Sequence, residues 1–106
     1  MRKQRTRPES RKVDVVITSA RYQAPGDRLA QARGFERRGP VWSDTLLFDR
    51  EALALSLRSG RRVVAGKETN LPGDFEIVHR LRLESDQWIV AEGGRADRDD
   101  LGVPLY

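Results

Sequence analysis

Residues 41–66, VWSDTLLFDREALALSLRSGRRVVAG, contain the signals that decide the fold of this 106-residue chain. The apolar run of residues 41–48 predicts a strand. Asp49, directly after it, is suited to cap a helix by accepting a backbone hydrogen bond. Gly60 is suited to end that helix, because glycine readily adopts the left-handed conformation that follows many helices. Residues 63–65 then predict another strand.

The segment between these two signals, residues 50–59, fits two kinds of structure. Leu53, Leu55 and Leu57 alternate with Ala52, Ala54 and Ser56, as in a strand with one buried face. The alanine and leucine content and the two end signals favour a helix instead. We therefore predict a short helix, in which Leu55 points roughly away from Leu53 and Leu57.

Strands are predicted on both sides of this helix. Residues 12–19 alternate, with Val13, Val15 and Ile17 on one face and Val16 as an exception. Residues 28–37 read as a strand in which Gly34 marks a bulge or bend. Residues 75–84 form the most regular alternation, and together with residues 88–91 they predict an antiparallel hairpin.

This order of elements, β-β-β-α-β-β-β, predicts a mainly β fold with one short helix. The sheet is expected to be small and curled or barrel-like, because short strands with Gly and Pro turns are typical of such folds. A helix after the third strand is also where the OB-fold has its helix, so the element order is OB-like. No motif in the chain identifies a family.

The net charge of +4 is unevenly distributed along the chain. Residues 1–12 contain six basic groups against Glu9, and we predict that they form a flexible basic arm. Residues 13–94 are predicted to be the small β-barrel-like domain. Residues 95–106 are predicted to be an acidic C-terminal tail, whose last apolar residues are able to dock back onto the domain: Val103, Leu105 and Tyr106.

The composition argues against several classes of protein. The chain contains no cysteine, so neither a disulfide framework nor a thiolate metal site is expected. No apolar run approaches the length that crosses a bilayer, and the basic N-terminus is not followed by the apolar region of a signal peptide. We therefore expect a cytoplasmic protein without a membrane partner.

Enzymatic activity is not expected. His79 is the single histidine, and its place in the apolar row of a predicted strand suggests a hydrogen-bonded, partly buried structural role. Asp97, Asp99 and Asp100 lack the glycine and spacing of a calcium loop, so we predict a solvated tail there. Gly93 and Gly94 lead into no predicted helix, as a phosphate-binding loop would require. We predict no metal, cofactor or small-molecule substrate.

The arginine content favours nucleic-acid binding. The chain contains 17 arginines and three lysines, and guanidinium groups suit phosphates and base stacking, although GC-rich coding gives the same bias. A sheet with arginines and aromatic side chains is typical of domains that bind single-stranded DNA or RNA. The predicted nucleic-acid ligands are Arg2, Lys3, Arg5, Arg7, Arg33, Arg37, Arg38, Arg80 and Arg82, with Tyr22 or Trp42 for stacking.

Two observations weaken this hypothesis. Arg80 and Arg82 are flanked by Glu76 and Glu84 and are able to pair with acidic neighbours, and Trp42 is able to fill the core. Residues 13–106 have a net charge of −1, so the arm and a local patch must supply the binding. The alternative is a protein–protein interaction or homo-oligomerisation module, in which the basic arm and the acidic tail contact a partner protomer.

Overall fold

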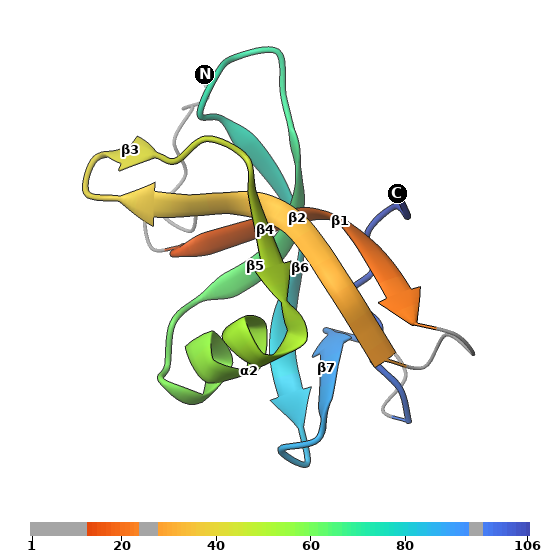
Figure 1. Cartoon of the computed structure of the whole chain (residues 1–106). Coiled ribbons are helices and arrows are strands. Elements are labelled where there is room, and N and C mark those ends of the chain that lie inside the picture. The colour runs from red at the N-terminus through yellow and green to blue at the C-terminus, as the bar shows by residue number, and fades with distance from the viewer. Residues whose placement is uncertain (1–12, 24–27, 94–96) are drawn as a thin grey trace.

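The computed structural model describes residues 13–23, 28–93 and 97–106 of the chain. These residues form an open, strongly curled sheet, a half-barrel, with one short helix on its inner side (Figure 1). The prediction of a mainly β fold with a curled sheet is confirmed. The elements are β1 (Val15–Gln23), β2 (Arg28–Arg38), β3 (Val41–Trp42), β4 (Leu46–Asp49), α2 (Arg50–Arg58), β5 (Val63–Glu68), β6 (Phe75–Glu84) and β7 (Trp88–Ala91).

The sheet has the strand order β3-β2-β1-β5-β6-β7, and β4 also pairs with β2. β1 and β5 are parallel, whereas every other strand pair is antiparallel. The connection from β4 to β5 contains α2 and brings β5 alongside β1, as parallel pairing requires. The predicted hairpin of β6 and β7 is present, and Ser85 and Asp86 form its turn with positive φ angles of 55° and 56°.

The single strand predicted for residues 41–48 is wrong, because the structure contains two strands there. The chain leaves the ladder at Ser43, whose hydroxyl accepts a hydrogen bond from the backbone N–H of Glu36 at 3.0 Å and donates to the carbonyl oxygen of Asp44 at 2.7 Å. β4 then pairs with a different part of β2, residues 31–34. Side-chain hydrogen bonds of this kind compete with strand pairing.

The predicted helix is confirmed as α2. Asp49 caps it, since its carboxylate accepts the backbone N–H of Ala52 at 2.7 Å. Gly60 follows the end of the helix with a φ of +86°. Leu53 and Ala54 are buried against the sheet, while Leu55 is 64% exposed and points away from it, as predicted.

Apolar side chains pack on both faces of the sheet. The main cluster lies between the sheet and α2 and includes Val15 and Ile17 of β1. A second cluster lies on the opposite face, which we call the outer face, and contains Val13, Val16, Val64 and Phe75 with the half-buried Phe35, Trp42 and Ile77. Val16 interrupts the apparent alternation because the two faces of β1 are both buried. The prediction that Val13 shares a face of the sheet with Val15 and Ile17 is therefore wrong.

Residues 97–106 pack against the sheet of their own chain. Asp100 bridges to Val90, and Leu105 bridges to Ala20 of β1 in the parallel direction. Leu101 is fully buried in the main cluster. Leu101 and the half-buried Val103 thus extend the core, whereas Leu105 is exposed, and the prediction of a solvated acidic segment is wrong for its central residues.

Asp99 is the buried centre of this docked segment, with 2% of its surface exposed. One carboxylate oxygen accepts the N–H of Leu29 at 2.6 Å and the Nε of Arg50 at 2.6 Å. The other accepts the N–H of Ile89 at 2.9 Å and the Nη2 of Arg50 at 3.1 Å. Arg50 also donates to the carbonyl oxygen of Gln87. The carboxylate therefore joins β2, β7 and the first turn of α2.

Because of this arrangement, the free energy of unfolding depends on pH in the acid range. Burial raises the pKa of the Asp99 carboxyl, but the hydrogen bonds from Arg50, Leu29 and Ile89 and the charge of Arg50 outweigh burial and hold it below its usual value. Because the pKa is lower in the folded state than the roughly 3.9 of an unfolded chain, the stabilisation is present above that pH and is lost as the pH falls through the folded value.

We therefore expect the free energy of unfolding to fall as the pH drops below about 4. Chemical denaturation at a series of pH values measures this decline. The decline is expected to be shallower in an Asp99→Asn variant, which has no carboxyl group to titrate at this position. Identical slopes in the two proteins would contradict the role assigned to the carboxylate.

Candidate nucleic-acid interface

Four of the predicted ligands lie on the outer face of the sheet. Arg80 is the register partner of Val64 in the second cluster, and Arg82 follows two positions later on the same face. Arg37 is the register partner of Trp42, and Arg33 lies two positions from Phe35 along β2. The arm residues Arg2, Lys3, Arg5 and Arg7 lie outside the described residues.

Three of these four arginines already have partners. The guanidinium of Arg33 lies 4.2 Å from the ring centroid of Tyr106, and Arg21 lies 4.9 Å from the same centroid. Arg37 lies 4.5 Å from the ring centroid of Trp42, and its Nε donates to the carbonyl oxygen of Val13 at 2.9 Å. Arg82 forms an ion pair with Glu84 at 2.9 Å.

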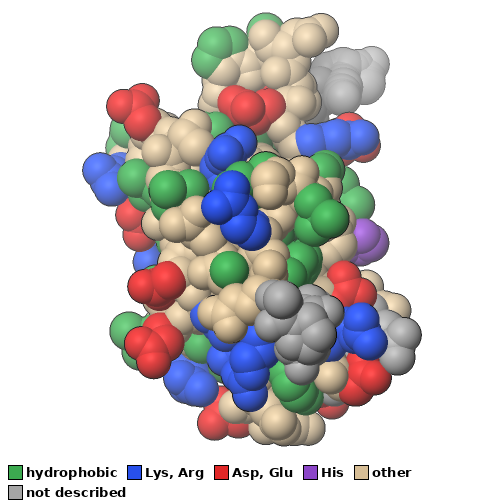
Figure 2. Space-filling model, turned by 45° about the vertical axis from the view of Figure 1, so that its right-hand side comes forward, with side chains coloured by type: hydrophobic (Ala, Val, Ile, Leu, Met, Phe, Trp, Pro, Cys, Tyr) green, Lys and Arg blue, Asp and Glu red, His purple; other side chains and the backbone are tan. Residues whose placement is uncertain are grey.

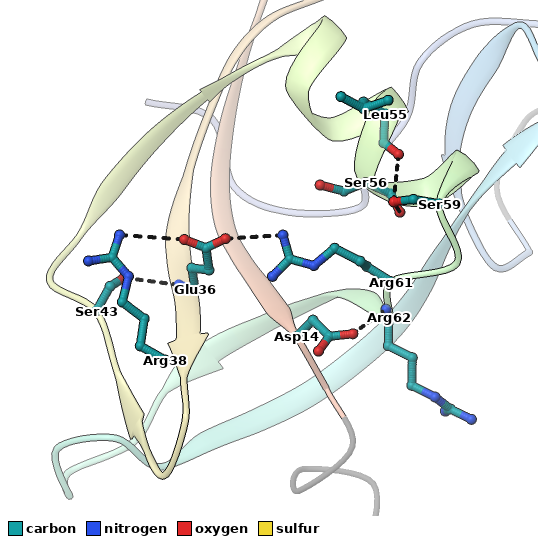
Figure 3. Close-up of polar contacts among 9 residues, drawn as sticks. All are labelled: Asp14, Glu36, Arg38, Ser43, Leu55, Ser56, Ser59, Arg61 and Arg62. Carbon is teal, nitrogen blue, oxygen red and sulfur yellow. Dashed lines mark hydrogen bonds and ion pairs between the residues drawn. The ribbon is translucent and has the colours of Figure 1, made fainter.

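Arg38 is separated from this group. It pairs with Glu36 at 3.5 Å, and Glu36 also pairs with Arg61 at 3.0 Å, so one carboxylate lies between two guanidinium groups (Figure 3). Its partner Glu36 is the register partner of Val15, which belongs to the main cluster. Arg38 therefore does not share the outer face with Arg80, because cross-strand partners lie on the same face of a sheet.

Arg62 is the residue that sequence reasoning failed to select. Its backbone N–H donates to the carboxylate of Asp14 at 2.8 Å, while its side chain extends away from Asp14 (Figure 3). It stands two positions before Val64, and this spacing in an extended chain places both side chains on the outer face. Alternation along the chain was the sequence signal that could have placed Arg62 on the outer face. Using that signal required knowing that β5 has buried residues on both of its faces.

Arg62 and Arg80 line one hollow of about 220 Å³ on the outer face. Both are exposed, and within the described residues neither guanidinium has a hydrogen bond or an ion pair. Val13, the first described residue after the basic arm, lines the same hollow. The acidic residue in its lining is Glu92.

The aromatic residues predicted for stacking are differently placed. Tyr22 lies in β1 and is half-buried against the main cluster, on the side of the sheet opposite the outer face. Its hydroxyl accepts the N–H of Leu101 at 3.0 Å, and burial raises the pKa of the phenol. Trp42 is half-buried, and its ring meets that of Phe75 edge-on with centroids 5.1 Å apart.

A larger groove lies beside the basic hollow on the outer face. It has a volume of about 730 Å³ and runs between residues 40–45, around β3, and residues 71–75, at the end of the β5–β6 connection and the start of β6. Val13 and Ile77 line both the groove and the basic hollow. Carboxylates surround the groove: Asp44, Glu68 and Asp74.

Charges are mixed on the face that Figure 2 shows. Lys and Arg side chains are interspersed there with carboxylates and hydrophobic side chains. His79 is half-buried in β6, and its side chain makes no hydrogen bond within the described residues.

The described part of the chain contains no group of three or more side chains placed to bind a metal ion. None of its helices is long and apolar enough to span a membrane.

Comparisons with protein-family models, curated proteins and solved structures found no match to this chain.

Proposed function

We propose that this chain is a non-enzymatic nucleic-acid-binding domain that holds single-stranded DNA or RNA on the outer face of its sheet. The observation that supports the proposal is the hollow shared by Val13, Arg62 and Arg80. Within the described residues these two guanidinium groups have no hydrogen bond or ion pair, and Val13, which follows the basic residues 1–12 in the sequence, lines the same hollow.

The rest of the outer face fits a single strand better than a duplex. Arg21 of β1 and Arg33 of β2 lie against the half-buried ring of Tyr106, so two guanidinium groups and one aromatic ring are close together on this face. Such surfaces suit unstacked bases, which a duplex does not offer. The likeness to the OB-fold, a five-stranded barrel that also binds single strands, is limited to element order, because this sheet has seven strands and is open.

We expect binding of a labelled single-stranded oligonucleotide, followed by fluorescence anisotropy, to weaken steeply as salt is raised. Neutralising the two arginines of the hollow in Arg62→Gln/Arg80→Gln is expected to reduce the slope of log affinity against log salt by about 2, or about 1 for each lost phosphate contact. A full-length variant with Arg2, Lys3, Arg5 and Arg7 changed to glutamine is expected to reduce it further.

The matched control is Arg58→Gln/Arg98→Gln, which removes the same charge from exposed arginines that pair with Asp86 and Asp97. This control is expected to retain the slope of the unmodified protein. An equal loss in both double variants would mean that only net charge matters. No binding to either a single strand or a duplex at low salt would overturn the proposal.

A further inference from the structure

The aromatic groove of the outer face differs in chemistry from the basic hollow beside it. Its floor contains Phe35, Trp42 and Phe75, and the ring centroids of Phe35 and Phe75 are 5.1 Å apart. On its rims, Val41 is 59% exposed and Leu71 is 55% exposed. Exposed apolar side chains on both rims of a groove with an aromatic floor are typical of a surface that binds a protein segment.

The loop that forms one wall is held in place by its own hydrogen bonds. The hydroxyl of Thr69 donates to the carboxylate of Asp74 at 2.8 Å and accepts the N–H of Leu71 at 3.2 Å. The N–H of Asp74 donates to the carbonyl oxygen of Leu71 at 3.1 Å. Leu71 is thus presented by a preformed turn, which lowers the entropy lost when a partner binds.

Negative charge predominates in the groove, because three carboxylates and the guanidinium of Arg37 line it. Arg37 lies over Trp42 and donates to the carbonyl oxygen of Val13. The carboxylates of Asp44 and Glu68 are exposed and have no hydrogen bond or ion pair within the described residues. Phosphates are repelled by such a rim, whereas lysine and arginine side chains are attracted to it.

We propose that this groove is a docking site for an extended protein segment in which a bulky apolar side chain is flanked by lysine or arginine. The apolar side chain packs against Trp42, Phe75 and Leu71. The flanking cations lie beside Asp44 and Glu68. The site goes beyond the proposed nucleic-acid function, since it uses different residues and a partner of opposite charge.

The test titrates the full chain into labelled peptides and measures fluorescence anisotropy. The probe is a short peptide with a central leucine flanked by lysines. Two further peptides replace its lysines by glutamate or its leucine by serine, and each is expected to bind about tenfold more weakly or worse. Equal binding of the lysine and glutamate peptides, or no binding of any, would overturn the proposal.

Matched variants of the protein locate the site. Leu71→Ser is expected to weaken binding of the lysine–leucine peptide by about tenfold or more, whereas Leu47→Ser, a similarly exposed leucine on β4 outside the groove, is expected to leave it unchanged. Asp44→Asn/Glu68→Gln is expected to weaken it and to reduce its dependence on salt. Its control is Glu51→Gln/Asp86→Asn, which removes the same charge elsewhere. Equal losses in a variant and its control would contradict the assignment.

Two other occupants are distinguished by further results. If the full chain sediments as a dimer and Leu71→Ser makes it a monomer, the groove is an interface between copies, and the proposal is overturned. If neutralising Arg2, Lys3, Arg5 and Arg7 strengthens peptide binding by about tenfold or more, the groove belongs to the arm of this chain. A monomer with unchanged affinity in that variant supports the external partner. Failure of all peptides leaves the oligonucleotide result unaffected, so the two proposals fail separately.

Discussion

Replacing Asp99 with asparagine is expected to lower the free energy of unfolding by about 3–5 kcal/mol, the usual loss when one member of a buried ion pair is removed. Each carboxylate oxygen accepts one backbone N–H and one nitrogen of Arg50. The amide NH₂ of asparagine therefore faces two donors in either orientation. Arg50 also loses its counter-ion, and at least one buried backbone N–H loses its acceptor.

Urea denaturation followed by tryptophan fluorescence measures this loss. The matched control is Asp100→Asn at the neighbouring position, where the carboxylate accepts the N–H of Gly102 at 3.3 Å near the surface. We expect the control to change stability by about 0.5 kcal/mol or less. Similar losses in the two variants would show that Asp99 is not the carboxylate that holds residues 97–106 against the sheet.

The second large effect is expected at Gly34, where alanine is predicted to cost about 3 kcal/mol or more. A Cβ atom built at this position lies 2.1 Å from the carbonyl oxygen of Val16 and 3.0 Å from the Cα of Ile17. Both neighbours are backbone atoms of β1, so the clash is relieved only by moving the strand. β1 lies at the centre of the sheet between β2 and β5.

Gly39→Ala separates this clash from the effect of adding a methyl group to any glycine. A Cβ at Gly39 meets no atom within 4 Å, and the cost there comes from its φ of +64°. We expect a loss of about 1–2 kcal/mol at Gly39, clearly smaller than at Gly34. Thermal or urea denaturation of both variants gives the comparison. Equal stability of the two variants would contradict the close approach of β1 and β2.

Local sequence signals predicted the parts of the fold that depend on neighbours in the chain. The cap at Asp49 and the glycine at residue 60 set the limits of α2, and regular alternation identified β6. The parallel pairing of β1 with β5 was not predictable in this way, because no local pattern specifies a partner 48 residues away. The same limit hid the second apolar cluster, which buries both Val16 and Val64.

Charged residues, including those of the candidate site, were predicted less well than the fold, because their placement depends on their ion-pair partners. Asp99 stands in an acidic run that looks solvated, but a partner 49 residues earlier, Arg50, makes its burial favourable. Likewise, the sequence does not show which arginines pair with a carboxylate, even where the acidic residue is close in the chain. Arg82 has a carboxylate partner, whereas Arg80 on the same face has none within the described residues.

The measurement that tests the proposed function most directly is an NMR titration of the isotope-labelled full chain with a single-stranded oligonucleotide. We expect the Nε–Hε signals of Arg62 and Arg80 to shift in fast or intermediate exchange, together with the amide of Val78 beside them in the same hollow. Signals of Arg58 on α2 are expected to stay in place. Shifts that spare Arg62 and Arg80 while affecting other arginines would contradict the proposed binding face.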